Sequence, residues 1–344
     1  MPDVPGIDHD RVSAWIAGTI DGAVPPFEFS LIEGGRSNLT YRVTDASGRR
    51  YVLRRPPLGH VLATAHDVAR EHRIISAVGR TGVPVAPALG VCTDESVNGA
   101  PFYVMGFVDG VVLDSPERAA GLTIEVKRDL SHDLIDVLAD LHAVDVDAVG
   151  LGDLAKREGY VERQVRRWTT QWENSHTRDL PAIDEVARRL ASAIPTQVGV
   201  SIAHGDYRFG NCLVDTATRR VTAVLDWELC TLGDPLADVG YLGVYWVSDD
   251  GSGSRPNDPT GAGGFPSYRE LVDRYAARTG RDVSRIDYYV AFSAFRLAVI
   301  SEGVYARYVN GAMGDAIDPE LLASFRDGVD MLAEGALAML GGGI

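Results

Sequence analysis

The sequence predicts an α+β protein with a small N-terminal lobe built on an antiparallel β-sheet and a larger, mainly helical C-terminal lobe. Strand-like runs joined by short turns dominate the first third of the chain, and apolar residues at helical spacing dominate the rest. The 344 residues are enough for two hydrophobic cores. We place the boundary after residue 106, so that the lobes comprise residues 1–106 and 107–344.

The N-terminal lobe is expected to open with a short helix over residues 10–18, capped by Asp8 or Asp10. The DASG turn at 45–48 predicts a hairpin, and a helix should follow over 64–79. A second hairpin, with its turn near Asn98 and Gly99, leads into the apolar run at 101–110. Strands are expected within the runs 27–35, 39–45 and 49–56.

The C-terminal lobe is expected to be helical. A buried helix is indicated by apolar residues three and four apart, which are Leu130, Leu134, Val137, Leu138 and Leu141. Residues 249–266 are rich in Gly, Pro, Ser and Asp and predict a loop. Further helices are expected over 159–173, 183–193, 267–280, 286–309 and 319–340.

Composition narrows the class of protein. A net charge of −15 argues against binding to nucleic acid or to an anionic membrane. The N-terminus lacks the basic and apolar regions of a signal peptide, and no apolar run approaches a membrane span. Cys92, Cys212 and Cys230 are scattered, which favours reduced thiols. We expect a cytoplasmic protein with a small-molecule partner, and a homodimer stays open.

The motifs HGDYRFGN at 204–211 and LDWE at 225–228 predict a site for phosphoryl transfer. Asp206 stands five residues before Asn211, and Asp226 ends a short hydrophobic run. Protein kinases have this spacing between the catalytic Asp and a metal-binding Asn, and end the next strand in a metal-binding Asp. We therefore predict Asp206 as the catalytic base and Asn211 and Asp226 as Mg²⁺ ligands. Asp and Asn also suit turns, but turn chemistry alone does not explain this spacing.

A phosphate cover is expected in GGRSNLTYRV at 34–43, which is not a GxGxxG pattern. Freed backbone amides at Gly34 and Gly35, with the polar side chains of Ser37 and Asn38, can reach phosphate oxygens. A plain hairpin turn is the alternative interpretation of this segment.

The strand YVLRR lies where kinases carry V-A-I-K, and this alignment puts Arg54 at the position of the phosphate-binding Lys. Glu71, on the following helix, is its expected partner. The adenine hinge is expected at Met105, Phe107 and Val108, through main-chain groups. The alternatives are a solvated strand end for Arg54 and an exposed helix charge for Glu71.

Two further residues are expected to be structural. A histidine ahead of a catalytic Asp commonly holds the loop by packing and hydrogen bonding, which is the role expected of His204. Asp238, in GDPLADVG, is expected to accept backbone N–H groups of that loop while starting a helix.

With these motifs the chain resembles the aminoglycoside phosphotransferase family of kinase-like enzymes, through HGDYRFGN, VLDWELCTLGDPLADVG and LHAVD. It is most similar to the branch found as the kinase domain of acyl-CoA dehydrogenase ten and eleven and as stand-alone bacterial proteins. The segments GGRSNLTYRV, YVLRRPPLG, GYVERQVRRW and FRLAVISEGVYARY carry that likeness. The resemblance covers roughly residues 25–340.

This resemblance implies a two-lobed protein-kinase-like fold, ATP as the phosphoryl donor and the roles given above for Asp206, Asn211 and Asp226. It does not fix the acceptor, because family members act on various small hydroxyl compounds. The branch linked to acyl-CoA dehydrogenases is associated with phosphorylation of 4-hydroxyacyl-CoA.

Two acceptors therefore compete. A cationic aminosugar would need acidic residues, and the available ones are Glu228, Asp234, Asp249, Asp250 and Glu302. A CoA thioester would need basic residues beside apolar ones, as offered on one predicted helix by Arg163, Arg166, Arg167, Trp168 and Trp172. We favour the anionic acceptor because of this arginine face beside Trp168 and the likeness to the branch linked to acyl-CoA dehydrogenases. The net charge of −15 points the other way, but distant surface charge is screened. The alternative for the arginines is a solvated helix face.

Two other functions compete with the kinase. A nucleotide-binding pseudokinase is supported only by the replacement of Lys by Arg54. A metal-dependent hydrolase would need clustered His ligands, which this sequence does not show.

Overall fold

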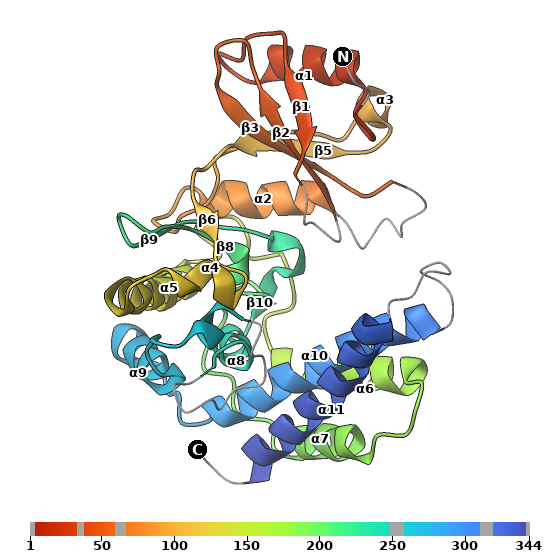
Figure 1. The fold of residues 1–344 in the computed structure, drawn as a ribbon, viewed down its shortest axis with the longest axis vertical. Helices are drawn as coiled ribbons and strands as arrows, with labels where there is room; N and C mark the ends of the chain where they lie inside the picture. Colours follow the sequence, from red (N-terminus) through yellow and green to blue (C-terminus); the bar gives the residue numbers. More distant parts are fainter. Residues whose placement is uncertain (1–3, 33–37, 59–66, 248–257, 310–318, 342–344) are drawn as a thin grey trace.

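The computed structural model describes residues 4–32, 38–58, 67–247, 258–309 and 319–341. Figure 1 shows a small lobe of strands with few helices above a larger, mainly helical lobe. The predicted α+β fold is confirmed.

The small lobe is a five-stranded sheet in the order β1-β2-β3-β5-β4, with every neighbouring pair antiparallel. Helix α1 (His9–Thr19) covers one face of the sheet, and α2 (Val68–Val78) lies between the other face and the large lobe (Figure 1). A one-turn helix, α3 (Glu95–Asn98), stands near the predicted turn. The strands are β1 (Glu28–Leu31), β2 (Leu39–Thr44), β3 (Arg50–Arg55), β4 (Ala88–Cys92) and β5 (Phe102–Gly106).

Strand β3 shows how the sequence pattern selects the inner arginine. Successive side chains of a strand point to opposite faces, so Tyr51 and Leu53 join the cluster under α1 while Arg54 faces α2. Arg55 points the other way again and donates to the carbonyls of Gly6 and Asn98. Of the two arginines at the end of β3, it is therefore Arg54 that faces the large lobe.

Short strands of the large lobe hold the two motif loops. The chain leaves β5 for β6 (Val111–Val112), which pairs with β8 (Cys212–Asp215), and β8 pairs with β9 (Arg220–Val224). Strand β7 (Ser201–Ala203) pairs with β10 (Thr231–Gly233). The loop with Asp206 therefore runs from β7 to β8, and the loop with Asp226 runs from β9 to β10.

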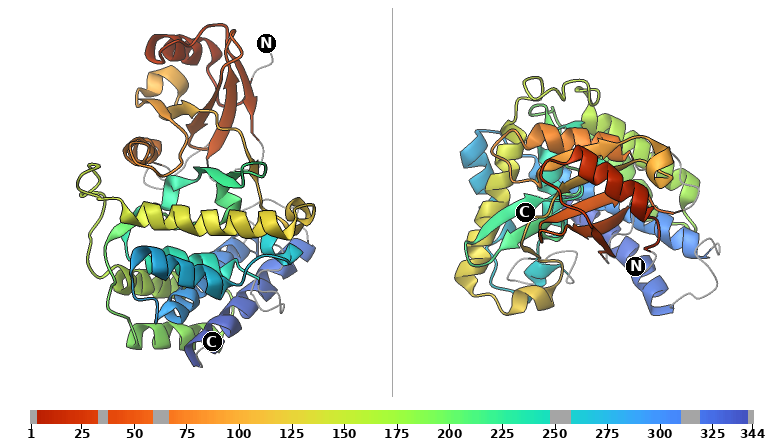
Figure 2. Two further views of the ribbon diagram at one scale, coloured as in Figure 1. Left: turned by 90° about the vertical axis from the view of Figure 1, so that its left-hand side faces the viewer. Right: turned by 90° about the horizontal axis from the view of Figure 1, so that it is seen from above.

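The helices of the large lobe surround these strands. Helices α5 and α9 lie side by side across the lobe, and α10 packs against α6, α8 and α11 (Figure 2). Most of α10 is buried, which explains its long apolar run. The bounds are α4 (Pro116–Ala120), α5 (Ile124–Ala143), α6 (Tyr160–Ser175), α7 (Pro181–Ser192), α8 (Leu236–Val244), α9 (Tyr268–Thr279), α10 (Ile286–Val309) and α11 (Pro319–Gly341).

Several smaller sequence predictions can be checked directly. The cap of α1 is Asp8, which accepts from the Arg11 N–H. Cys92, Cys212 and Cys230 are free and buried. Most of the loop predicted over 249–266 lies outside the described residues, and its described part holds the 3₁₀ turn Pro259–Ala262. No helix in the described part of the chain is long and apolar enough to cross a membrane.

Candidate active site

The loop between β7 and β8 is held in place by Asp238, which lies in the first turn of α8. Asp238 is 1% exposed, and its two carboxylate oxygens accept the N–H groups of His204 at 2.6 Å and Gly205 at 2.8 Å. His142 of α5 adds a third contact, with Nε2 at 3.2 Å. Burial raises the pKa of Asp238, but His142 and the backbone donors outweigh burial and hold that pKa below its usual range.

His204 ties the same loop to the strand that precedes Asp226. Its Nε2 lies 2.8 Å from the carbonyl oxygen of Leu225, and its Nδ1 lies 3.2 Å from the N–H of Asp206. A carbonyl can only accept, so Nε2 carries the proton and Nδ1 accepts from Asp206. The neutral ring therefore sets the direction of the Asp206 backbone.

Gly205 is required by this arrangement. Its φ is +85°, and a Cβ there would lie 2.9 Å from the carbonyl oxygen of Leu229. Both the left-handed backbone and the close approach exclude a side chain.

Asp206 has one oxygen anchored by hydrogen bonding and one oxygen without a hydrogen bond among the described residues. The Nδ2 of Asn211 donates to Asp206 Oδ2 at 2.6 Å and to the Asp206 carbonyl at 2.8 Å. Asp206 Oδ1 is buried and makes no hydrogen bond to any described residue, although Arg208 Nε lies 3.5 Å away. The carboxylate is thus oriented by one oxygen and open to a further donor at the other.

Asp226 lies beside Asn211 in a strained backbone conformation. The Leu225 N–H donates to the Asn211 carbonyl at 2.8 Å, which fastens the two loops together. Asp226 has φ 62° and ψ 66° at the start of the 3₁₀ turn Trp227–Leu229. A residue other than glycine in this region costs energy, and such residues cluster at functional sites.

Arg54 brings the small lobe to this pair of loops. Its Nε lies 3.1 Å from Glu71 Oε2, and its Nη2 lies 2.7 Å from Asp226 Oδ1 and 3.7 Å from Glu228 Oε2. We call Arg54 and these three carboxylates the ion cluster. One arginine among three acids leaves an excess of negative charge, which favours a further cation.

Glu71 is held more firmly than its partners in the ion cluster. It is 2% exposed, and it accepts from Asn38 Nδ2 at 2.9 Å and from the Tyr103 hydroxyl at 3.1 Å. Burial raises the pKa of Glu71 to about 7, although Arg54 and Tyr103 act in the opposite direction. Asp226 and Glu228 raise this pKa further by repulsion.

The donor atoms beside the ion cluster fit Mg²⁺. With Nδ2 turned to Asp206, the Asn211 amide leaves its oxygen for a ligand, and Asp226 offers a carboxylate. Mg²⁺ prefers such hard oxygen ligands. Within the described ranges, no group of three or more His, Cys, Asp or Glu residues is arranged to hold a metal. The candidate ligand set therefore depends on the asparagine.

The predicted nucleotide contacts are only partly described. Gly34, Gly35 and Ser37 lie outside the described residues, whereas Asn38 packs on Glu71. At the predicted hinge, the Gly106 N–H donates to Pro87 and the Phe107 N–H to Arg50. Met105 pairs with Val52 inside the sheet. The Val108 N–H has no hydrogen bond among the described residues, so it is the hinge group left for a ligand.

The structure separates the predicted acceptor residues. Arg166 and Arg167 are exposed on α6, and Arg163 donates to the Lys156 carbonyl at 2.7 Å. The three arginines share a depression of about 450 Å³ with Thr170, Gln171 and Asn174, and none of them contacts the ion cluster.

The predicted acidic residues are also dispersed. Glu302 is fully buried and accepts both the N–H and the hydroxyl of Thr177, at 2.8 and 2.7 Å. Asp234 is fully buried and accepts from the Tyr289 hydroxyl at 2.7 Å. Asp249 and Asp250 lie outside the described residues. Glu228 is the predicted acidic residue that the described structure brings to Arg54.

Sequence reasoning missed residues that line the approach to Asp206. Arg208 lies over the ring of Tyr245, with 4.9 Å from its Cζ to the ring centroid, and Tyr245 contacts Tyr241 at 5.2 Å between centroids. The position of Arg208, two residues after Asp206, was a signal available in the motif. Tyr241, Tyr245 and Arg296, the last of which is described below, had no such signal in the sequence.

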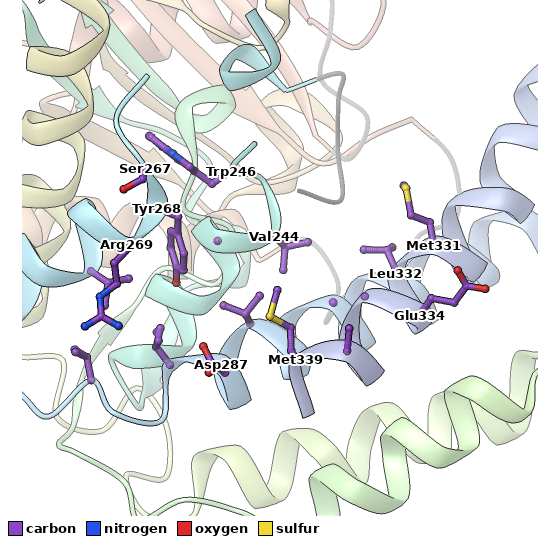
Figure 3. A pocket seen from close by; sticks show the side chains of 18 of the residues that line it. Val244, Trp246, Ser267, Tyr268, Arg269, Asp287, Met331, Leu332, Glu334 and Met339 are labelled. Carbon is purple, nitrogen blue, oxygen red and sulfur yellow. The ribbon is translucent and has the colours of Figure 1, made fainter. Parts of the chain in front are cut away.

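A large cavity lies elsewhere in the described structure, between α8, α9, α10 and α11. Its volume is about 740 Å³, and its lining includes Trp246, Tyr268, Leu332 and Met339 (Figure 3). Trp246 also stacks on Phe209 of the motif loop, with 5.9 Å between ring centroids. The ion cluster and Asp206 are not part of its lining.

Comparisons with known proteins agree with this geometry. Residues 28–282 match the model of the phosphotransferase enzyme family. Mouse acyl-CoA dehydrogenase family member 10 is 35% identical over 316 residues, which cover 90% of this chain. Chicken acyl-CoA dehydrogenase family member 11 is 36% identical over 286 residues, which cover 80% of this chain. The chain spans only 29% and 36% of the length of these two relatives.

Solved structures show the same fold. A crystal structure from Ralstonia eutropha, with the provisional description of an aminoglycoside phosphotransferase, superposes with a TM-score of 0.82 and 34% identity, covering 96% of this chain and 98% of that one. An aminoglycoside phosphotransferase in complex with AMP-PNP and hygromycin B gives a TM-score of 0.61 at 16% identity, covering 97% and 100%. Fold, motif geometry and family model together show that the chain belongs to the phosphotransferase enzyme family.

Proposed function

We propose that the protein is an ATP- and Mg²⁺-dependent phosphotransferase that moves the γ-phosphoryl group to a hydroxyl group of a small molecule. In this proposal residues 1–106 form the nucleotide-binding lobe, and residues 107–344 carry the catalytic loop and the acceptor site.

The observation that carries the proposal is the different environment of the two carboxylate oxygens of Asp206. One oxygen is held by Asn211 at 2.6 Å, and the other is buried without a hydrogen bond among the described residues. A general base needs this combination, because it must be oriented and still be able to accept a proton. The Asp226 carboxylate and the Asn211 amide lie beside it as oxygen donors.

In the proposed reaction the acceptor hydroxyl oxygen attacks the γ-phosphorus. The new O–P bond forms as the bond from phosphorus to the β–γ bridging oxygen breaks, and ADP leaves with that electron pair. The hydroxyl proton passes to Asp206. Mg²⁺ bound by Asn211 and Asp226 would neutralise charge on the triphosphate.

Arg54 replaces the usual lysine in the proposed nucleotide site. The ion pair between Arg54 and the buried Glu71, at 3.1 Å, holds the guanidinium beside Asp226. Asn38 and, outside the described residues, Gly35 and Ser37 would contact phosphate. The main chain at Met105, Phe107 and Val108 would contact adenine. The Val108 N–H, which has no hydrogen bond among the described residues, would be the principal donor.

The acceptor can be narrowed from these observations. Hydroxyacyl-CoA compounds suit the likeness to acyl-CoA dehydrogenase family members 10 and 11. An aminoglycoside is the second candidate, because Glu228 adds negative charge near Asp226. We leave Glu302 out of the acceptor site because it is fully buried against Thr177. The exposed Arg166 and Arg167 remain a competing anion site on α6.

The test is formation of ADP from MgATP with a panel of hydroxyl compounds, including hydroxyacyl-CoA thioesters and aminoglycosides. Asp206→Asn should lower kcat by about 10²–10⁴ and leave the affinity for MgATP nearly unchanged. Asp215→Asn is the matched control, because Asp215 caps the turn after β8 and contacts Thr218. Tight MgATP binding with no turnover of any acceptor would favour the pseudokinase instead.

A further inference from the structure

Arg296, in the middle of α10, is a buried arginine for which the described residues supply no acidic partner. Arg296 is only 8% exposed, and its Nε makes no hydrogen bond within the described structure. No ion pair joins it to any described Asp or Glu, although the chain has 48 acidic and only 33 basic residues. A shortage of carboxylates therefore does not explain the unpaired charge.

The contacts of Arg296 are aromatic. Its Cζ lies 5.6 Å from the ring centroid of Trp168 on α6 and 5.3 Å from that of Tyr241 on α8. Such ring faces stabilise a cation only in part, and burial of a guanidinium without a counter-ion is unfavourable. A negative group brought by a ligand would relieve this cost.

A second unsatisfied donor lies next to Arg296. The indole Nε1 of Trp168 is buried and makes no hydrogen bond within the described structure. Indole nitrogen can only donate, as can guanidinium, so both orphaned groups call for an acceptor atom. Two unsatisfied donors from different helices, α6 and α10, therefore belong to side chains in contact, because Arg296 lies over the Trp168 ring.

A series of side-chain contacts runs from Tyr241, beside Arg296, to the proposed base Asp206. The hydroxyls of Tyr241 and Tyr245 are 3.3 Å apart, Arg208 lies over Tyr245, and Arg208 Nε is 3.5 Å from Asp206 Oδ1. Burial raises the pKa of Tyr241 well above its ordinary value, Asp206 raises it further, and Arg296 lowers it. Tyr241 thus lies within electrostatic reach of both Asp206 and Arg296.

We propose that Arg296, with Trp168 Nε1, binds an anionic group of the acceptor while the acceptor hydroxyl lies at Asp206. The inference rests on the proposed phosphotransferase function and narrows its acceptors to hydroxyl compounds that carry a carboxylate or a phosphate. The planar guanidinium can bind either group with two parallel hydrogen bonds. A polycationic acceptor would leave Arg296 unpaired and place like charge beside it.

The first experiment measures phosphorylation of matched acceptors. The panel pairs hydroxycarboxylates with their amides, and hydroxyalkyl phosphates with their neutral methyl esters, with MgATP in each case. The wild type is expected to prefer the anionic member of each pair. Arg296→Gln should raise the KM for that member by about 10- to 100-fold, the worth of a charge-assisted pair, and leave the KM for ATP unchanged.

Two further arginine variants make the assay specific. Arg285→Gln is the matched control, because Arg285 also lies over a ring, that of Tyr288 at 6.0 Å, but is exposed immediately before α10. It should leave all KM values unchanged. Arg167→Gln tests the competing site, because the exposed Arg167 lies over the same Trp168 ring, with 5.3 Å from its Cζ to the ring centroid. A rise in acceptor KM in Arg167→Gln alone would overturn the assignment to Arg296.

The second experiment does not depend on turnover. With MgADP saturating, inorganic phosphate and acetate are titrated separately against wild type and Arg296→Gln, and thermal stability is followed. Stabilisation by one or both anions should be lost in the variant, and the stronger anion identifies the group. Arg296→Lys keeps the charge without the planar fork and should give an intermediate loss, which provides a second variant if Arg296→Gln does not fold.

The outcomes separate the two proposals. Phosphorylation of neutral or cationic acceptors, with a KM that does not respond to Arg296→Gln or Arg296→Lys, would overturn the anion site and leave the kinase. Arg296-dependent binding of phosphate or acetate, without phosphorylation of any acceptor, would support the anion site and remove the kinase. Absence of both anion binding and an anionic preference would overturn the inference.

Discussion

Asp238 and Glu71 are both almost fully buried carboxylates with three contacts to donors, yet their pKa values shift in opposite directions. Asp238 is surrounded by backbone N–H groups and His142, and its pKa is lowered despite burial. Burial raises the pKa of Glu71 to about 7, and the neighbouring carboxylates Asp226 and Glu228 add to the rise. The first environment is complete without a ligand, whereas the second carries a charge imbalance. We infer that the first serves as scaffold and the second as binding site.

The largest expected effect is on the scaffold. Asp238→Ala leaves two buried N–H groups and His142 without their acceptor, so we expect the free energy of unfolding to fall by about 3–5 kcal/mol. Chemical denaturation of the variant measures this loss. Glu71→Gln, which keeps the size and hydrogen-bonding capacity of the side chain, should cost far less. Equal losses in the two variants would remove the distinction between scaffold and site.

Gly205→Ala tests the same scaffold without changing a charge. Left-handed strain and the approach of Cβ to the Leu229 carbonyl, 2.9 Å away, should together cost about 1–3 kcal/mol and lower kcat. The matched control is Gly99→Ala, where φ is +67° but no atom lies within 4 Å of the new Cβ. The difference between the two variants isolates the contact with the loop of Asp226. A larger loss at Gly99 would contradict the expectation.

The pH dependence of stability should distinguish the two carboxylates. Glu71 keeps its proton up to pH about 7 in the folded state, whereas an unperturbed glutamate has a pKa of 4.5, so its contribution to stability is complete below pH 4.5 and lost by about pH 7. The slope should reach at most about −1.4 kcal/mol per pH unit in this window. Asp238 contributes in the opposite sense, since its stabilisation is lost as pH falls below its usual pKa.

Denaturation measured from pH 4.5 to 7 in wild type and in Glu71→Gln checks this expectation. The variant should lack the falling contribution, so the stability of the wild type relative to the variant should increase as pH decreases. Parallel curves would show that Glu71 keeps an ordinary pKa in the folded protein.

The smallest expected effect on stability comes from Asp226→Asn. Asn tolerates the left-handed backbone, and Arg54 keeps Glu71 and Glu228 as partners, so unfolding should change by less than about 1 kcal/mol. Binding should respond strongly, with MgATP affinity reduced by roughly the 10- to 100-fold that disturbing a metal site costs. Calorimetric titration of ATP with and without Mg²⁺ measures this loss of affinity. A loss of equal size without Mg²⁺ would assign Asp226 to another role.

Sequence patterns were sufficient where the information was local. The alignment of YVLRR with V-A-I-K singled out Arg54, which the structure pairs with Glu71, and the spacing from Asp206 to Asn211 matched their hydrogen bond. The helices of the large lobe followed from apolar periodicity. These features depend on a few neighbouring residues, so the sequence contains the signal.

Contacts between distant segments were not accessible in this way. The arginines of α6 suggested a ligand face, but that helix turns Val161, Val165 and Trp172 to the core and leaves Arg166 and Arg167 in solvent. Glu302 meets Thr177 only because α10 crosses the α6–α7 connection. The unpaired state of Arg296 depends on every helix packed around it, which no periodicity encodes.

The paired arginines at the end of β3 restrict how this protein can vary in length. An insertion of one residue between the Asp45 turn and Arg54 would exchange the faces of the strand, placing Leu53 opposite Glu71 and turning Arg54 under α1. An insertion of two residues would restore the alternation and shift the strand by about 6.6 Å, two steps of its rise. Because such a shift would still carry Arg54 away from Glu71 and Asp226, length changes before Arg54 should survive natural selection only where the turn itself absorbs them.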